Sequence, residues 1–135
     1  MIQEPIVTLN SVNIARVNFS GVDLIANVDV ENTNGFSIPM PKVDWELFVN
    51  ESSFTEGTVE DKRTIGSREK ISLDIPISVS YDRLFGTFGS LLGLLGSGSS
   101  GIPYKVDMKL RFPMPLLEHI VYKLDHTGVL PLPSL

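Results

Sequence analysis

The sequence of 135 residues contains no cysteine. This absence excludes disulfide scaffolds, thiolate metal sites and catalysis by a thiol. It leaves the cellular compartment open, because an exported domain can also lack cysteine. A chain of this length needs no such cross-links, since folding buries roughly two-thirds of the unfolded surface. We therefore expect a single domain over residues 1–135.

Long apolar runs and concentrated positive charge are also missing. No stretch of about 18 apolar residues is present, so we expect no transmembrane segment. Sixteen acidic residues against eleven basic ones give a net charge of −5. The Lys and Arg residues are interleaved with acids rather than clustered, which argues against binding to a phosphate backbone. We expect no nucleic-acid partner.

Alternation of apolar and polar side chains is the strongest pattern that is present. A period of two residues is typical of strands with one buried face. Such alternation occupies residues 24–31, 43–49, 71–79 and 104–112.

Three further features refine the strand prediction. Residues 6–19 change parity twice, which we interpret as a long first strand with bulges or a break near Asn10. Pro76 interrupts the cleanest alternating run and cannot donate a ladder hydrogen bond, which predicts an edge strand or a bulge. Residues 118–124 are predicted to form a closing strand that pairs with the strand ending at Phe112.

One region follows helical rather than strand spacing. Its apolar residues recur at intervals of one and three and predict a helix over residues 81–95. Gly86, Gly89 and Gly93 each cost about 1 kcal/mol in a helix interior, so the apolar stripe must dock on the rest of the domain. The stripe consists of Leu84, Phe85, Phe88, Leu91, Leu92 and Leu95. Residues 96–101 contain only Gly and Ser and are predicted to be a flexible loop.

These elements together predict an all-β fold: a sandwich of about seven antiparallel strands with one short helix near 81–95. The second alternating run ends in Asn32-Thr33-Asn34-Gly35-Phe36. Asn side chains cap turns and Gly tolerates unusual backbone, so this stretch is expected to end the strand, bend the chain and return Phe36 to the core. We favour this structural role over a ligand site at Asn32 and Asn34.

The same stretch, followed by Ile38-Pro39, the aromatic strand Trp45–Asn50 and Gly57, resembles the late embryogenesis abundant group 2 family, also called the water stress and hypersensitive response domain. Residues 69–84 and the segment Gly128–Pro133 fit the same family pattern. Thr33 stands where the family usually has proline.

The resemblance implies a sandwich of the immunoglobulin or fibronectin III type with one helix, in which Asn32, Asn34, Phe36 and Pro39 form a structural motif. It implies no enzymatic activity and no cofactor. Bacterial members often follow a lipoprotein leader, so the resemblance implies a lipid-anchored domain in the cell envelope, on the periplasmic side. The alternative is a cytoplasmic protein.

The expected function is a non-enzymatic stress-related protective or binding module. Its partner would be a protein or a lipid, contacted through the helix stripe or a sheet edge. The stripe either covers one end or face of the sandwich or loosens and presents Leu91, Leu92, Leu94 and Leu95 to a lipid acyl chain, a membrane surface or a partner groove.

The alternative function is a hydrolase or metal-dependent enzyme with a site in the loops near Asn32, Asn34 and His119. Two observations argue against it. His119 and His126 are separated by an odd number of residues, which places them on opposite faces of an extended strand. No Gly-x-Ser-x-Gly elbow occurs either. We therefore expect no catalytic residue and no metal ligand.

Overall fold

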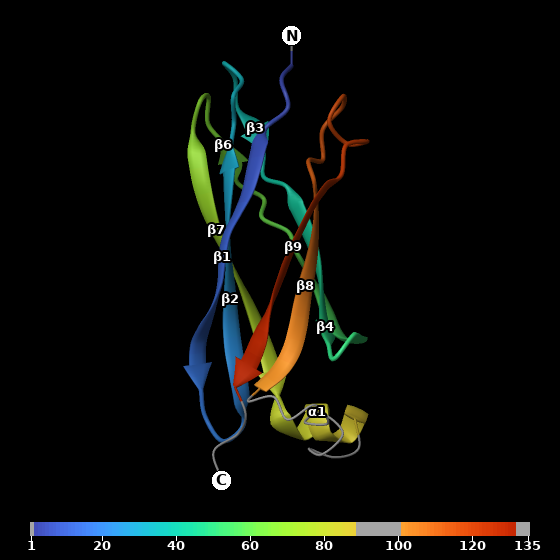
Figure 1. The fold of residues 1–135 in the computed structure, drawn as a ribbon. Helices are drawn as coiled ribbons and strands as arrows, with labels where there is room; N and C mark the ends of the chain where they lie inside the picture. The colour runs from blue at the N-terminus through green and yellow to red at the C-terminus, as the bar shows by residue number, and fades with distance from the viewer. Residues whose placement is uncertain (1, 89–100, 132–135) are drawn as a thin grey trace.

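The structure, a computed structural model, describes residues 2–88 and 101–131. Two antiparallel sheets pack face to face along most of the length of the molecule (Figure 1). The strands are β1 (Ile6–Val17), β2 (Gly21–Glu31), β3 (Ile38–Pro39), β4 (Lys42–Val49), β5 (Ser52–Val59), β6 (Thr64–Ile65), β7 (Lys70–Ser80), β8 (Gly101–Arg111) and β9 (Tyr122–Pro131), and the helix is α1 (Tyr81–Phe88).

The first sheet has the strand order β1-β2-β7, and the second has the order β5-β4-β8-β9. The short strands β3 and β6 pair with each other near one end. Apart from those two, the described residues form seven strands of eight residues or more. The prediction of an all-β sandwich of about seven antiparallel strands with one short helix is confirmed.

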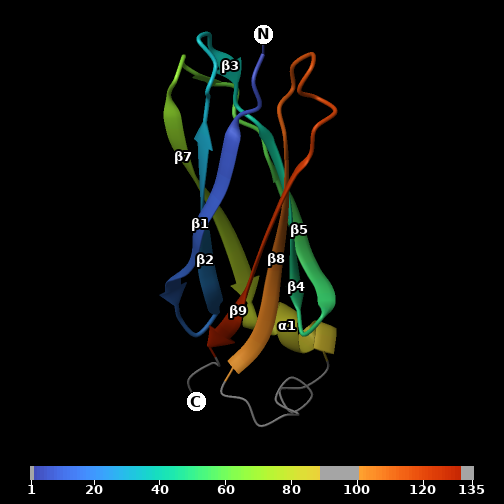
Figure 2. The ribbon, with the colours of Figure 1, turned by 45° about the horizontal axis from the view of Figure 1, so that its top comes forward.

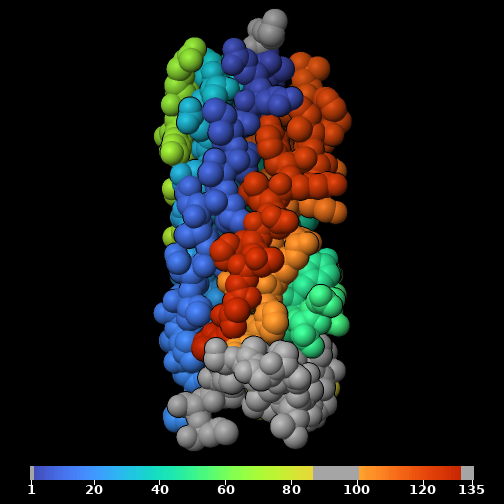
Figure 3. Space-filling view, in the orientation of Figure 1, coloured from blue at the N-terminus to red at the C-terminus, as the bar shows by residue number. Residues whose placement is uncertain are grey.

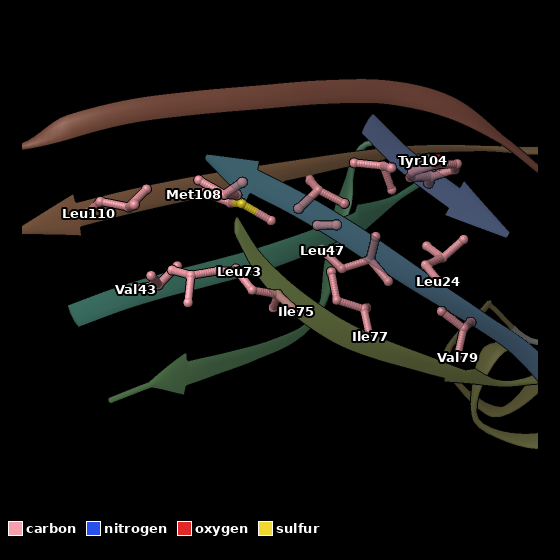
Figure 4. Packing of buried hydrophobic residues seen from close by; sticks show 14 of the residues in the cluster. Leu24, Val43, Leu47, Leu73, Ile75, Ile77, Val79, Tyr104, Met108 and Leu110 are labelled. Carbon is pink, nitrogen blue, oxygen red and sulfur yellow. The ribbon is translucent and has the colours of Figure 1, made fainter. Parts of the chain in front are cut away.

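The core lies between the sheets and is built by the alternation seen in the sequence. In β2, every second side chain from Val22 to Val30 is buried, and the residues between them face outward. Figure 4 shows side chains of β7 and β2 pointing toward those of β4 and β8. Full burial of one such Leu or Ile side chain stabilises the fold by about 1.5–3 kcal/mol.

The structure agrees with the predictions of bulges in β1 and of an edge position for β7, the strand that contains Pro76. The register between β1 and β2 shifts between Leu9 and Ser11 and again between Ile14 and Arg16, while β1 runs without interruption from Ile6 to Val17, which confirms the bulges of the prediction rather than a break. Within the described residues β7 pairs with β2 alone. Pro76 therefore lies on an edge strand, where its missing N–H interrupts no ladder.

The closing strand differs from its prediction. It begins at Tyr122 and ends at Pro131, so residues 118–121 are not part of it. Residues 113–121 instead form turns that bury Leu117. The partner was right, since β9 pairs with β8. The inward positions of its second half include His126 and Gly128, which gave no apolar signal in the sequence.

Two aromatic side chains of central strands lie over glycines of edge strands. A Cβ on Gly57 would come within 2.5 Å of the Trp45 ring, and one on Gly128 within 2.7 Å of the Tyr104 ring. The missing side chains leave room for the two rings to pack against the core. These close approaches fix glycine at both positions.

The two ends of the sandwich are closed by different elements. The N-terminal segment, β3 and β6 lie at one end, and α1 lies at the other (Figures 1 and 2). We call the first, which contains Asn32 and Asn34, the asparagine end, and the second, which contains α1 and the β1–β2 turn, the helix end. Figure 3 shows β1 and β9 side by side, so the two sheets also meet along one edge.

Candidate functional site

Asn32 and Asn34 are the buried polar side chains of the described core. Their exposed fractions are 0% and 2%, respectively. Burial of an amide costs free energy unless its polar atoms have hydrogen-bond partners. The partners of the two amides therefore decide what this end can do.

The amide of Asn32 joins three parts of the chain. Its Nδ2 donates to the carbonyl oxygens of Phe36 at 2.7 Å, Gly66 at 3.0 Å and Ile65 at 3.2 Å. Its Oδ1 accepts hydrogen bonds from the backbone N–H of Asn34 at 3.0 Å and from the Asn34 Nδ2 at 3.1 Å. The end of β2 is thereby tied to the turn that follows it and to β6.

The amide of Asn34 holds the N-terminal segment. Its Oδ1 accepts the backbone N–H of Gln3 at 2.6 Å, and its Nδ2 donates to the Gln3 carbonyl at 2.9 Å. The amide thus pairs with Gln3 as a strand backbone would. Thr33 adds a longer bond from its hydroxyl to the Glu4 carbonyl at 3.3 Å. We call these contacts among Gln3, Asn32 and Asn34 the asparagine lock.

Every polar atom of the two amides has a partner within the chain. This arrangement stabilises a strand end and gives a ligand no free amide donor. His119 lies exposed between β8 and β9, while His126 on β9 is half-buried, with its ring 6.2 Å from that of Tyr104. Among residues 2–88 and 101–131, no group of three or more His, Asp and Glu residues is placed to hold a metal ion.

Phe36 does not return to the core as expected. Its side chain is 45% exposed, whereas Ile38 and Met40 are buried in its place. Asn32 draws the Phe36 carbonyl inward, and the ring projects outward. Pro39 is half-buried in β3, opposite Thr64 of β6.

Arg63, which is exposed, and Asp61, which is half-buried, form a charged pair near the asparagine end. Arg63, whose carbonyl accepts the Met40 N–H, forms an ion pair with Asp61 at 2.7 Å. Hydrogen bonds from Arg63 hold the pKa of Asp61 below its ordinary value. Burial raises the pKa of Tyr122, and the nearby charge of Glu4 adds to the effect.

The helix end is built on apolar side chains. The helix begins at Tyr81 because the Ser80 hydroxyl accepts the Arg83 N–H at 3.4 Å, in the manner of an N-cap. Leu84 is fully buried, and Phe85 is half-buried and stacks on Tyr81 with a centroid separation of 6.3 Å. Both side chains therefore cover the end of the core.

Polar contacts connect the helix to both sheets. The Tyr81 N–H donates to the Ser20 carbonyl at 2.9 Å, and its hydroxyl donates to the Pro131 carbonyl at 3.4 Å. The Arg83 guanidinium lies 5.0 Å from the centre of the Phe54 ring and donates to the Phe54 carbonyl at 3.1 Å. Arg83 thus bridges α1 and the edge strand β5.

The rest of the predicted stripe falls where the structure gives no description. The helix is confirmed from Tyr81 to Phe88, and the side chain of Phe88 lies outside the described part. So do Leu91, Leu92 and Leu95, together with residues 96–100 of the predicted loop. Gly101, assigned to that loop, is instead the first residue of β8.

Gln3 and Arg83 were not singled out from the sequence. Gln3 acts through its backbone, so its residue type carries no signal. The start of the helix did have one, because Ser80 followed by Asp82 is typical of a helix N-terminus. Arg83 lies three residues after Ser80, in the first turn of the helix, so its position could have been derived from this signal.

A hollow of about 470 Å³ lies on the outer face of the second sheet, away from the asparagine lock. Its wall includes Phe48, Glu51, Lys105 and Asp107. Lys105 and Asp107 form an ion pair with each other at 3.5 Å. Across the described ranges, no helix has the length and apolar character needed to cross a membrane.

Solved structures share this fold. A putative late embryogenesis abundant protein from Arabidopsis matches with a TM-score of 0.68 and 28% identity, covering 99% of this chain and 74% of that one. A protein from Archaeoglobus fulgidus matches at 0.60 with 12% identity, covering 98% of this chain and 99% of that one, which shows similarity of fold alone.

Sequence comparisons point the same way. A desiccation-related protein from Arabidopsis thaliana is 27% identical over 99% of this chain and 78% of its own length. The late embryogenesis abundant protein Lea14-A from Gossypium hirsutum is 25% identical over 99% of this chain and 85% of its own. The family model described as late embryogenesis abundant protein, LEA_2, matches residues 27–128, which include the asparagine lock's Asn32 and Asn34, the strand β7, the helix and most of the second sheet. The chain therefore belongs to the late embryogenesis abundant type 2 family.

Proposed function

We propose that this protein is a non-enzymatic, stress-related protective module that acts during water loss by weak contact with other proteins through its helix end. The observation that carries the proposal is its similarity, over 99% of the chain, to proteins named as desiccation-related and late embryogenesis abundant. Two features of the structure support it.

The first feature is the pairing of polar side chains on the outer face of the first sheet. Asn10 donates to Asn27 at 2.8 Å, and Asn27 donates to Asp74 at 2.7 Å, in one row across three strands. A second row joins Asp23 to Arg16 and to Ser78. Side chains that bond to one another keep their partners when water is withdrawn, so this face supports a fold that persists on drying.

The second feature is exposed apolar surface beside the helix. Phe19, in the turn between β1 and β2, is 90% exposed, and Val17 is 47% exposed. Ser20 follows Phe19 in the chain, and its carbonyl accepts a hydrogen bond from the N–H of Tyr81, the first residue of α1. An exposed aromatic ring next to the helix supports a contact with apolar surfaces that other proteins expose as they lose water.

Drying a probe enzyme tests the proposal. Lactate dehydrogenase is dried and rehydrated with this protein or with the same mass of serum albumin, and the recovered activity is measured. We expect greater recovery with this protein. Equal recovery with albumin contradicts a protective role.

Two matched variants locate the contact. Phe19→Ser removes the exposed ring at the helix end, and Phe36→Ser removes the exposed ring at the asparagine end. We expect Phe19→Ser to lose part of the protection and Phe36→Ser to keep it. Equal loss in both variants contradicts a contact at the helix end.

A lipid partner is separated from a protein partner by vesicle flotation. The protein is mixed with phosphatidylcholine vesicles and with vesicles that also contain phosphatidylglycerol. If the protein stays in the vesicle-free fraction with both kinds of vesicle, the result supports contact with proteins. If the protein floats with the vesicles and Phe19→Ser abolishes this flotation, the result favours contact with lipid. A lipid-anchored location in the cell envelope and the water stress and hypersensitive response subtype stay predictions, and fractionation of the native cells tests the location.

A further inference from the structure

The asparagine lock contains the one Asn-Gly pair of the sequence, Asn34-Gly35. Asparagine is a thermolabile residue. Asparagine loses its side-chain amide group fastest when the next residue is glycine. The backbone nitrogen of that next residue attacks the asparagine side chain, and glycine is conformationally permissive and has no side chain to hinder the attack. Gly35 is exposed, and a Cβ built on it meets nothing within 4 Å. The position therefore does not require glycine for steric reasons.

The reaction of such a pair is the loss of ammonia. The Gly35 nitrogen forms a bond to Cγ of Asn34 and gives up its proton. The bond between Cγ and Nδ2 breaks, and Nδ2 leaves as ammonia. Water then opens the resulting succinimide at one of its two carbonyls and leaves aspartate or isoaspartate at position 34.

The lock opposes the first step. The Asn34 amide is held by the N–H and the carbonyl of Gln3 and by Oδ1 of Asn32. To present Cγ to the Gly35 nitrogen, the amide must turn away from these partners. Because the side chain is 2% exposed, water also has little access to it in the closed state.

We propose that Asn34 is a deamidation site that the asparagine lock protects, so that the residue reacts only when the lock opens. The product cannot restore the whole lock, since a carboxylate can still accept the Gln3 N–H but cannot replace the two bonds that Nδ2 donates. A carboxylate has no hydrogen to donate to the Gln3 carbonyl or to Asn32 Oδ1, and a charge at this buried position lacks a cationic partner among the lock residues. Each opening thus carries a chance of permanently releasing the N-terminal segment.

The rate of deamidation in the intact protein tests this directly. The protein is incubated in mildly alkaline buffer with and without urea, and aspartate and isoaspartate at position 34 are measured by peptide mapping. We expect the folded protein to react at least roughly tenfold more slowly than the unfolded chain, as for a site exposed only by local opening. Equal rates in the two conditions overturn the proposal.

A matched pair of variants assigns the protection to the lock. Gln3→Pro removes the N–H that binds Asn34 Oδ1, whereas Gln3→Ala changes only an exposed side chain. We expect Gln3→Pro to accelerate the reaction roughly fivefold, the effect of one lost hydrogen bond, and Gln3→Ala to leave it unchanged. Equal rates in the two variants contradict protection by the lock.

Two further variants connect the reaction with its consequence. Gly35→Ala is expected to fold as the parent does and to suppress deamidation in urea as well. Asn34→Asp is expected to release the N-terminal segment, seen as fast hydrogen exchange at the Gln3 amide. Retained protection of that amide in Asn34→Asp overturns the claim that the product cannot lock.

Discussion

The two ends of this sandwich close the same core by different physical means. At the asparagine end, two buried amides satisfy backbone groups from three parts of the chain. At the helix end, Leu84 and Phe85 cover the core with apolar surface. Hydrogen bonds are directional, so the first end depends on the identity of two residues. Apolar packing depends mainly on volume, so the second end tolerates more sequences.

The largest expected effect comes from removing the centre of the asparagine lock. Asn32→Ala leaves the carbonyls of Phe36 and Gly66 without the amide that binds them, and the Asn34 N–H loses its acceptor. We expect a loss of about 3 to 4 kcal/mol in the free energy of unfolding, measured by urea denaturation. The control Asn13→Ala makes the same change at an exposed site, with an expected effect within about 0.5 kcal/mol. Equal effects at both positions contradict a structural lock.

At the helix end, Leu84→Ala removes a fully buried side chain. We expect it to lower the free energy of unfolding by about 2 to 3 kcal/mol through lost burial and a residual cavity. Leu116→Ala, where the side chain is 67% exposed, serves as the control and should be close to neutral. If Leu84→Met lowers the free energy of unfolding as much as Leu84→Ala does, packing at the helix end does not depend mainly on side-chain volume.

A stabilising change at the helix end sharpens the contrast. Gly86 is an exposed helical residue, and a Cβ built on it meets nothing within 4 Å. Gly86→Ala should therefore raise the free energy of unfolding by about 0.5 to 1 kcal/mol. Gly35→Ala at the asparagine end also enters open space but lies outside a helix, so we expect a smaller gain. The midpoints of thermal unfolding of the two variants measure the difference.

The smallest expected effect is a response to alkaline pH. Burial raises the pKa of Tyr81 above that of the unfolded chain. The unfolded state therefore loses this proton first as pH rises past about 10, and stability falls there while it is unaffected at neutral pH. Tyr81→Phe should make urea stability decline less steeply at alkaline pH. An unchanged alkaline slope in Tyr81→Phe counts against the burial of this hydroxyl.

The strands with one apolar face could be predicted from the sequence because burial imposes a period of two on them. β5 was missed as a separate strand, because its edge position leaves several residues exposed and Gly57 replaces a side chain under Trp45. The second half of β9 was missed for a related reason, since Gly128 makes way for the Tyr104 ring.

The motif Asn32-Thr33-Asn34 was visible in the sequence, but its partners were not. The Gln3 backbone lies 31 residues away from Asn34, and no pattern of residue types marks a main-chain contact of that kind. The prediction that Phe36 returns to the core was wrong, because Asn32 holds the carbonyl of Phe36 rather than its ring. Long-range contacts to backbone groups were thus the part that only the structure supplied.

The exchange of the side-chain amide protons of Asn32 tests the central claim most directly. Both Nδ2 protons point at carbonyl oxygens in a site with no solvent exposure. Observed by NMR of the native protein in D₂O, they should persist as long as the backbone amides of the core strands, while those of exposed Asn13 disappear at once. Loss of the Asn32 signals as fast as those of Asn13 would contradict the lock, and with it the account of how this end of the sandwich is closed.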